Sequence, residues 1–390
     1  MKSVTQQVEV PFHRAMVGEE EVEAVANVIR SGWLTMGPRT IEFEEQFGRY
    51  IGAEYCIAVN SCTAALHLAL DAIGLQPGDE VLVPTNTFTA TGETVAYMGA
   101  KPALVDIDPR TLNLDVLDAK RRLTPRTKAI IPVHLSGQPC DMDEIHAFAE
   151  QYGLHVVEDA AHALPASYQG KNVGAISEIT TFSFYATKTL TTGEGGMIAT
   201  NDMNFADRMR IMRLHGIGRD AWKRYSKAGS WRYAVLDAGF KYNLTDMASA
   251  LGLVQLKRCD QMALQRSIIA ARYHEAFSFQ EALETPTVKT DRQSAWHLYV
   301  LRLNLEKLSI GRDEFIEELR KFGIEASVHF IPLHLHPYYQ KKYGYKHGDF
   351  VVAEREYERY LSLPIFPGMT DAEIEAVISS VLAVVRMNLR

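Results

Sequence analysis

The sequence contains little cysteine, no long apolar run and no excess of basic residues. Its 390 residues include four cysteines, at positions 56, 62, 140 and 259, and none belongs to a CxxC pair. Scattered thiols exclude a disulfide-stabilised secreted scaffold, so we expect reduced cysteines in a cytoplasmic protein. No apolar run approaches the length of a membrane span, and the first sixteen residues lack the apolar core of a signal peptide. We therefore expect no association with membranes.

The charges are nearly balanced: 41 lysines and arginines face 48 aspartates and glutamates, which gives a formal net charge of −7. A mildly acidic chain has no overall attraction for nucleic acid, so we expect no nucleic-acid partner. The hydrophobic fraction of 47% and the charged fraction of 23% are typical of a globular protein. A chain of this length can form one large domain and a smaller one, each with its own core.

Short apolar runs alternate with amphipathic segments between about residues 52 and 200. We expect strands at 55–59, 80–84, 102–107, 128–133, 155–158 and 181–184. We expect helices at 63–73, 142–152 and 205–214. The strands are rich in valine and isoleucine on both faces, as in a mainly parallel sheet covered by crossover helices. The pattern predicts an α/β fold.

The later part of the chain has a different pattern. It predicts one or two long helices over 244–271, a strand over 295–303, a helix over 312–322, a proline- and histidine-rich loop over 331–345 and a helix over 370–387. We therefore expect a large α/β domain over 1–265 and a small C-terminal α+β domain over 266–390. No glycine- or serine-rich linker separates them, so we expect the two parts to pack tightly.

A lysine follows one of the expected strands within a glycine-rich segment. Residues 181–196 have the sequence TFSFYATKTLTTGEGG, and Lys188 lies four residues beyond the strand. A lysine held in such a loop suits Schiff-base chemistry, in which its amine attacks an aldehyde and later carries protons. The alternative is a surface lysine in a turn.

An aspartate ends a second strand, in the sequence HVVEDAAHA. Asp159 lies where α/β folds place ligand contacts, and His162 follows three residues later. A carboxylate at this position can keep a pyridine nitrogen protonated, which makes the ring an electron sink. The alternative for Asp159 is a helix N-cap.

A third segment, YCIAVNSCTAALHLAL, leads from a strand directly into a helix. The free N–H groups at the start of that helix suit a phosphate, although a serine-capped helix with no ligand has the same sequence features. The segment lacks the glycines of a nucleotide-binding loop. A phosphate cradle, a strand-end acid and a later lysine, in this order, are the three anchors of pyridoxal phosphate (PLP).

The chain resembles the DegT/DnrJ/StrS family of sugar aminotransferases. The resemblance rests on FSFYATKTLTTGEGGM, VVEDAAHA and GFKYNLTDMASALGLVQL, with SGWLTMGPRTIEFEEQF, VPTNTFTATGETVAYMGAKPALVDID, PVHLSGQPCDMDEI and SVHFIPLHLHPYY in family-like order from about Pro11 to Val385. It implies the type I PLP-dependent aminotransferase fold and a homodimer. It also implies amination of a keto sugar attached to a nucleotide.

The resemblance assigns roles to residues that would hold the cofactor. Lys188 would form the Schiff base with PLP and act as the proton shuttle. Asp159 would pair with the pyridine nitrogen, His162 would contact the ring hydroxyl, and Phe88 would stack on the ring. The expected phosphate contacts are Cys62, Thr63 and Ser183, together with Asn243, which would reach the phosphate from the neighbouring subunit.

The same resemblance implies that the substrate is bound by Thr35, Tyr185 and His329. The KYN sequence at 241–243 and HGIGRDAWKR upstream are similar to the branch that makes UDP-4-amino-4-deoxy-L-arabinose, although Tyr185 stands where that branch often has histidine. SGWLTMGP and TTGEGG resemble enzymes that act at C4. The basic and aromatic stretch WKRYSKAGSWRY predicts an ordered loop that could contact a diphosphate.

These patterns predict an aminotransferase that moves an amino group from L-glutamate to a nucleotide-linked keto sugar at C4, with PLP as cofactor. The alternatives are a C3 sugar aminotransferase and a non-catalytic PLP-binding regulator with the same fold. We expect no metal site, because His329, His334 and His336 have no nearby carboxylate or cysteine ligands in the sequence.

Overall fold

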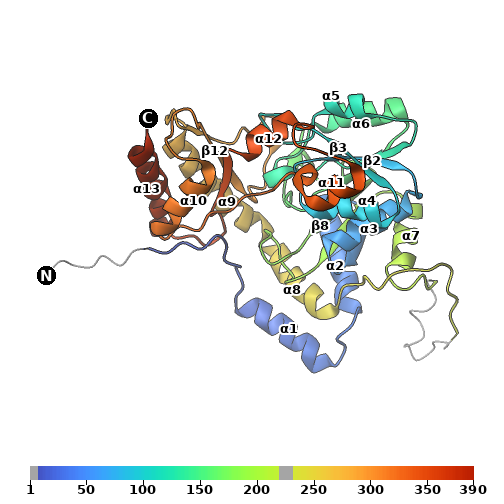
Figure 1. Ribbon diagram of the computed structural model, residues 1–390. Helices are drawn as coiled ribbons and strands as arrows, with labels where there is room; N and C mark the ends of the chain where they lie inside the picture. The colour runs from blue at the N-terminus through green and yellow to red at the C-terminus, as the bar shows by residue number, and fades with distance from the viewer. Residues whose placement is uncertain (1–7, 219–231) are drawn as a thin grey trace.

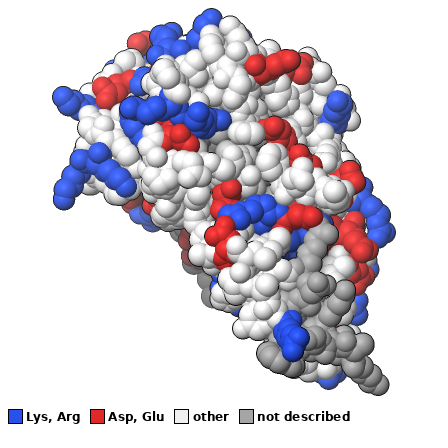
Figure 2. All heavy atoms as spheres, turned by 90° about the vertical axis from the view of Figure 1, so that its right-hand side faces the viewer, with Lys and Arg blue, Asp and Glu red and all other residues white. Residues whose placement is uncertain are grey.

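The computed structural model describes residues 8–218 and 232–390 (Figure 1). All but the last two residues of the expected WKRYSKAGSWRY loop lie outside this described part. On the face shown in Figure 2, lysines and arginines are interspersed with aspartates and glutamates. Within the described residues, no helix combines the length and apolar character needed to cross a membrane.

A seven-stranded sheet forms the centre of the larger part. Its strand order is β1–β9–β8–β5–β4–β2–β3, and only β9 runs antiparallel to its neighbours. The strands are β1 (Tyr55–Val59), β2 (Glu80–Pro84), β3 (Lys101–Val105), β4 (Thr127–Ile130), β5 (His155–Asp159), β8 (Ile179–Ser183) and β9 (Gly196–Thr200). The expected α/β class with a mainly parallel sheet is confirmed, and the six expected strands are all present with small shifts of their ends.

Helices cover both faces of this sheet because its apolar side chains alternate between two cores. Val81 and Val83 of β2 pack with α3 (Cys62–Ala72), α4 (Thr89–Tyr97) and α7 (Met203–Met212). Leu82 points the opposite way, toward α5 (Val116–Arg122) and α6 (Met142–Tyr152). Figure 1 shows these two helical layers on either side of the strands. Because the parallel strands all run in one direction, their carboxyl ends lie along the same edge of the sheet.

The C-terminal part is built on a small antiparallel sheet. Its strands are β10 (Leu283–Glu284), β12 (Tyr299–Leu303) and β13 (Tyr360–Leu363), packed with α9 (Cys259–Phe277), α10 (Arg312–Lys321) and α13 (Asp371–Asn388). A further small sheet joins β6 (Ser167–Tyr168), β7 (Lys171–Asn172) and β11 (Arg292–Gln293). Helix α9 continues across residue 265, and the division of the chain there into two domains stays a prediction.

The segment 331–345 is not the plain loop that its composition predicts. It contains a 3-10 turn, η3 (Leu333–Leu335), and helix α11 (Pro337–Tyr343), and α12 (Val351–Tyr357) follows. Pro337 occupies the first helical position, where its fixed φ is favourable and a missing N–H has no effect. Gly344 ends the helix with a φ of 77°. The prolines and glycines of this segment therefore delimit a helix.

The N-terminal segment adds two helices, α1 (Glu19–Ser31) and α2 (Pro38–Ile51), that pack against α8 (Asp246–Lys257). In Figure 1, α1 projects below the body of the molecule and lies beside α8. Asp246 joins these elements. Its Oδ1 accepts hydrogen bonds from the N–H groups of Gly37 (2.7 Å) and Thr40 (3.0 Å), so a buried carboxylate caps the positive end of α2.

Candidate active site

A cavity of about 430 Å³ opens where β5 and β8 end and α3 begins. Because the chain brings several strand ends to this one edge, residues far apart in the sequence meet there. Nine of the eleven expected site residues line the cavity: Cys62, Thr63, Phe88, Asp159, His162, Ser183, Tyr185, Lys188 and His329. Residues of the C-terminal part, including His297 and Phe330, contribute to the wall as well.

Lys188 is held in a turned loop directly after β8. Its own N–H donates to the carbonyl of Tyr185 at 2.9 Å, and the hydroxyl of Thr191 donates to the carbonyl of Phe184 at 3.1 Å. Burial lowers the pKa of Lys188 to about 8, although the thiol of Cys62 and the carboxylate of Asp159 act in the opposite direction. The amine therefore loses its proton far more readily than that of an exposed lysine.

Asp159 ends β5 and is only 5% exposed. Its Oδ2 accepts a 2.8 Å hydrogen bond from the hydroxyl of Thr91, and its Oδ1 accepts a 3.1 Å hydrogen bond from the N–H of Ala161. Burial raises the pKa of Asp159, and these two donors act against that shift. Residues 160–166 form turns rather than a helix, so Asp159 is not a helix cap.

His162 has a defined hydrogen-bonding state. Its Nδ1 accepts a 3.3 Å hydrogen bond from the N–H of Ser136. Burial, together with the charge of Lys188, keeps the pKa of His162 well below its ordinary value, so the ring is neutral. A neutral ring whose Nδ1 accepts carries its proton on Nε2. His162 can therefore donate a hydrogen bond through Nε2.

The start of α3 forms one side of the cavity and presents N–H groups that suit an anion. The hydroxyl oxygen of Ser61 caps the helix by accepting from the N–H of Ala64 at 3.1 Å. The N–H groups of Cys62 and Thr63 lie in the first turn, where no intrahelical acceptor exists. A Cβ at Gly196 would lie 2.7 Å from the carbonyl oxygen of Ser61, so the glycine permits β9 to approach the helix start closely.

Two aromatic residues and a histidine border the open side of the cavity. The side chain of Phe88 is 56% exposed and its ring centroid lies 5.6 Å from that of Phe330. Tyr185 is 47% exposed. His329 lies 3.0 Å from the hydroxyl of Ser362 through Nδ1, and burial lowers its pKa to about 4. These side chains leave an aromatic face and neutral polar groups available to a ligand.

Thr35 and Asn243, the other two expected residues, do not line the cavity of their own chain. Thr35 is exposed, and its carbonyl accepts a 3.1 Å hydrogen bond from the N–H of Asp246. Asn243 pairs with Val59 at the end of β1, and its Oδ1 accepts a hydrogen bond from Lys241. Because only two residues separate Asn243 from Asp246, Thr35 and Asn243 belong to one continuous piece of structure.

Three further residues line the cavity that were not expected from the sequence: Thr91, His297 and His13. Thr91 binds Asp159, His297 lies against Lys188, and the ring of His13 lies 3.0 Å from the carbonyl of Ala186 through Nε2. A threonine three residues after Phe88 in TNTFTATGE gave the only local signal. The two histidines lie in segments whose sequence shows no strand-end motif, so only the fold brings them to the cavity.

The residues present fit pyridoxal phosphate. The first turn of α3, closely approached by Gly196, would cradle the phosphate, and Asp159 and Lys188 would provide an acid for the ring nitrogen and an amine for the aldehyde. An amine and a carboxylate in one cavity at the strand ends of a mainly parallel sheet define a PLP-dependent enzyme of the type I fold.

The chain belongs to the DegT/DnrJ/EryC1/StrS aminotransferase family, whose model matches residues 15–382. It is 52% identical over 378 residues to the protein MJ1066 of Methanocaldococcus jannaschii, covering 97% of this chain and 98% of that one. It is 48% identical over 377 residues to the spore coat polysaccharide biosynthesis protein SpsC of Bacillus subtilis, with coverage of 96% and 97%. The structure of the putative sugar aminotransferase Spr1654 from Streptococcus pneumoniae, in its pyridoxamine phosphate (PMP) form, matches with a TM-score of 0.91 at 32% identity. The match covers 97% of this chain and 98% of that one.

These similarities confirm the family resemblance, the type I fold and PLP as the cofactor. The protein is a PLP-dependent aminotransferase.

Proposed function

We propose that this enzyme transfers an amino group from L-glutamate to C4 of a nucleotide-linked keto sugar, for the synthesis of an amino sugar that enters a polysaccharide. The observation that carries the proposal is the placement of Lys188 and Asp159 in one cavity, with the pKa of the lysine lowered to about 8. The spore-coat relative SpsC supports a polysaccharide pathway. SGWLTMGP and TTGEGG support C4, and the KYN sequence at 241–243 supports the UDP-4-amino-4-deoxy-L-arabinose branch.

When bound, PLP supplies an aldehyde that joins amines and a ring that withdraws electrons from the bond to be broken. Lys188 has a different task at each stage. Its Nζ would hold the cofactor covalently and, once an amino donor has displaced it, would take up the α-proton of that donor. The same atom would later release that proton. A pKa near 8 leaves part of the amine unprotonated at neutral pH, so the same atom can both accept and release a proton.

Asp159 and His162 would orient the ring from two sides. The carboxylate of Asp159 would keep the proton on the ring nitrogen, and its partners Thr91 and Ala161 favour the ionised form that does so. The Nε2 proton of His162 would be donated to the ring hydroxyl. The first turn of α3 and Ser183 would hold the phosphate, and Phe88 would cover one face of the ring.

Tyr185 and His329 are the proposed sugar contacts, since a phenol and a neutral imidazole can both donate and accept hydrogen bonds to hydroxyl groups. The neutral state of His329 leaves one ring nitrogen able to accept, which a protonated ring could not do. A nucleotide diphosphate would extend from the cavity toward the solvent-exposed side of Phe88 and Tyr185.

The active form is proposed to be a homodimer in which each chain completes the cavity of the other. Thr35 and Asn243 lie outside their own cavity but are joined through Asp246, so they can enter a neighbouring site together. The adjacent Trp33 and Leu34 are 39% and 46% exposed. Exposed apolar residues are typical of a subunit interface when they lie beside a segment that does not line the cavity of its own chain.

The position of amination tests the proposal directly. The purified enzyme is incubated with L-glutamate and a UDP-linked 4-keto pentose, and NMR of the product locates the new amine. We expect an amine at C4 and one 2-oxoglutarate released per sugar. Parallel reactions with L-aspartate and L-glutamine test the donor, and a nucleotide-linked 3-keto sugar is the matched substrate control. Amination of the 3-keto sugar alone would contradict the proposal and assign a C3 enzyme.

A further inference from the structure

His297 lies against the amine of Lys188, from which it is separated by 109 residues in the sequence. Its Nε2 is 3.3 Å from Nζ of Lys188, and the residue is 6% exposed. Its other ring nitrogen, Nδ1, is buried and has no hydrogen-bond partner among the described residues. Among the described residues, the contact with Lys188 is therefore the hydrogen bond that the structure gives this side chain.

The contact defines which atom donates. Burial and the nearby positive charges keep the pKa of His297 well below its ordinary value, so the ring is neutral. When Lys188 carries its proton, its ammonium group can only donate, so Nε2 of the neutral His297 ring accepts and Nδ1 carries the ring proton. Other titratable groups face Lys188 from the surrounding elements: His13, Cys62, Asp159, His162, Arg266 and His329. His297 is the residue for which a side-chain hydrogen bond to Nζ is observed.

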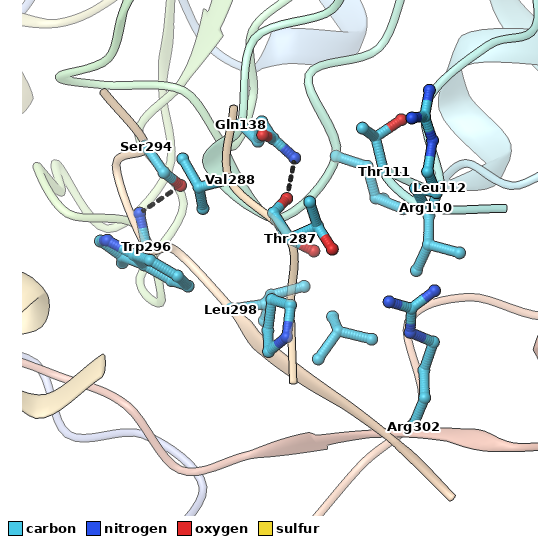
Figure 3. Close-up of a pocket in the computed structure, with 14 residues that line it drawn as sticks. Arg110, Thr111, Leu112, Gln138, Thr287, Val288, Ser294, Trp296, Leu298 and Arg302 are labelled. Carbon is cyan, nitrogen blue, oxygen red and sulfur yellow. Dashed lines mark hydrogen bonds between the residues drawn. The ribbon is translucent and has the colours of Figure 1, made fainter. Parts of the chain in front are cut away.

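The backbone on both sides of His297 is hydrogen-bonded to the turn at Ser136 and Gly137. The N–H of Ser136 in this turn donates to His162. The N–H of Ala295 donates to the carbonyl of Gly137 at 3.0 Å, and the N–H of Leu298 donates to the carbonyl of Ser136 at 3.3 Å. The segment separates two hollows. Trp296 lines a second, smaller pocket, shown with Ser294 and Leu298 in Figure 3, whereas His297 lines the main cavity.

Two further residues hold this segment in place. A Cβ at Gly137 would lie 2.9 Å from the carbonyl oxygen of His162 and 3.0 Å from the nitrogen of Trp296, so only glycine permits this close approach. Arg266 is 1% exposed, and its Nη1 donates to the carbonyl oxygens of Trp296 (3.3 Å), His297 (3.2 Å) and Ile365 (2.6 Å). The guanidinium group of Arg266 therefore holds the backbone carbonyl of His297 in place.

We propose that His297 is the positioning residue for Lys188: its Nε2 holds the free amine at the cavity wall during the interval in which that amine carries a proton. An amine on four rotatable bonds would otherwise sample many positions between taking up a proton and returning it. The proposal rests on the proposed role of Lys188 as the amine that binds the cofactor and moves the proton.

The test measures the pKa of Lys188 in the full-length, cofactor-free protein. Acetic anhydride acylates only the unprotonated amine, and mass spectrometry of the peptide containing Lys188 follows the rate from pH 6 to 11. We expect a midpoint near pH 8 for the wild type. His297→Phe keeps the ring packing against His162 but removes the acceptor, so the midpoint falls by about one to two pH units, the size of a hydrogen bond to a charged group.

Two matched variants separate the hydrogen bond from packing. His297→Gln places an amide oxygen near the position of Nε2 and should restore the wild-type midpoint. His297→Asn places its oxygen near Nδ1, too far from Lys188, and should behave like the phenylalanine variant. Unchanged midpoints in His297→Phe and His297→Asn would overturn the proposal.

A second measurement uses the cofactor-loaded protein. His297→Phe should bind PLP with an unaltered visible band, but L-glutamate should bleach that band about ten- to a hundredfold more slowly, and His297→Gln should recover most of the rate. An equal rate in all variants would contradict the positioning role. A failure of the proposed function would give a different result. If Lys188→Ala keeps the visible band, Lys188 does not have the proposed role, whatever the His297 variants show.

Discussion

The hydroxyl of Thr91 donates a 2.8 Å hydrogen bond to the carboxylate of Asp159. Thr91 lies in the first turn of α4, three residues after Phe88, which precedes that helix. The start of α4 therefore places two groups. Phe88 is proposed to cover the cofactor ring, and Thr91 orients the carboxylate of Asp159. The hydrogen bond connects the segment that follows β2 with the end of β5, and its two residues are 68 positions apart in the chain.

Replacing Thr91 with valine should weaken PLP binding about tenfold. The substitution keeps the shape of the side chain but removes a donor to a buried carboxylate, which is worth about 1.5 kcal/mol. The ionised form of Asp159 is then less favoured, so its pKa rises further and its attraction for a protonated ring nitrogen declines. The control is Thr94→Val, because Thr94 is also buried in α4 but donates only to the carbonyl of Thr91. Equal affinities of the two variants in an absorbance titration would contradict the assigned role.

Replacing Gly196 with alanine should weaken the binding of the cofactor phosphate by a factor of ten or more. The new Cβ would lie 2.7 Å from the carbonyl oxygen of Ser61 and 2.8 Å from the nitrogen of Cys62, so the first turn of α3 must shift. Gly311→Ala is the control, since its Cβ would meet only the flexible end of Glu314 at 3.8 Å. Inorganic phosphate binding to the cofactor-free protein measures the effect, and an unchanged dissociation constant would show that the phosphate binds elsewhere.

Asp246→Asn should lower both the stability of the chain and its tendency to dimerise. The carboxylate accepts from the N–H groups of Gly37, Arg39 and Thr40, and loss of its charge at the start of α2 should reduce the free energy of unfolding by about 1–2 kcal/mol. Asp115→Asn, at the exposed start of α5, is the matched cap substitution. Sedimentation should show a weaker dimer for Asp246→Asn alone. A wild type that sediments as a monomer would refute the shared site.

Lys188→Met should stabilise the cofactor-free protein at pH 7. The pKa of Lys188 is lowered on folding, from an ordinary 10.5 to about 8, so the folded state binds its proton less tightly than the unfolded state. That difference destabilises the wild type below pH 8 and disappears as the pH rises from 8 to 10.5. The gain in melting temperature of the methionine variant should therefore shrink over this range. A gain that is constant with pH would show that the lysine is not perturbed.

The positions of Asp159, Lys188 and the start of α3 could be predicted from sequence because each follows a recognisable strand, and parallel strands end at one edge of a sheet. His297 and Arg266 could not be predicted. Both lie in the C-terminal part, and their approach to Lys188 depends on how α9 and the segment before β12 pack against the larger sheet. No local pattern encodes that packing.

Two helices that were not expected, α11 and α1, show a related limit. Residues 331–345 were predicted as a loop because proline and histidine disfavour helix interiors, yet α11 begins at Pro337, the one helical position that suits proline. Helix α1 was not expected, although three glutamates in its first turn and Gly32 at its end are ordinary helix signals. For α11, the composition of the segment concealed the positions of its capping residues, whereas α1 could have been predicted from its own sequence.

The central claim is that Lys188 binds PLP covalently and is released by an amino donor. The most direct measurement is the visible absorbance of the purified protein, reconstituted with PLP, before and after addition of L-glutamate, with Lys188→Ala measured in parallel. We predict a yellow band in the wild type that bleaches with glutamate, and no lysine-linked band in the variant. A wild-type band that is also present in Lys188→Ala, or no band after PLP is supplied, would contradict the account.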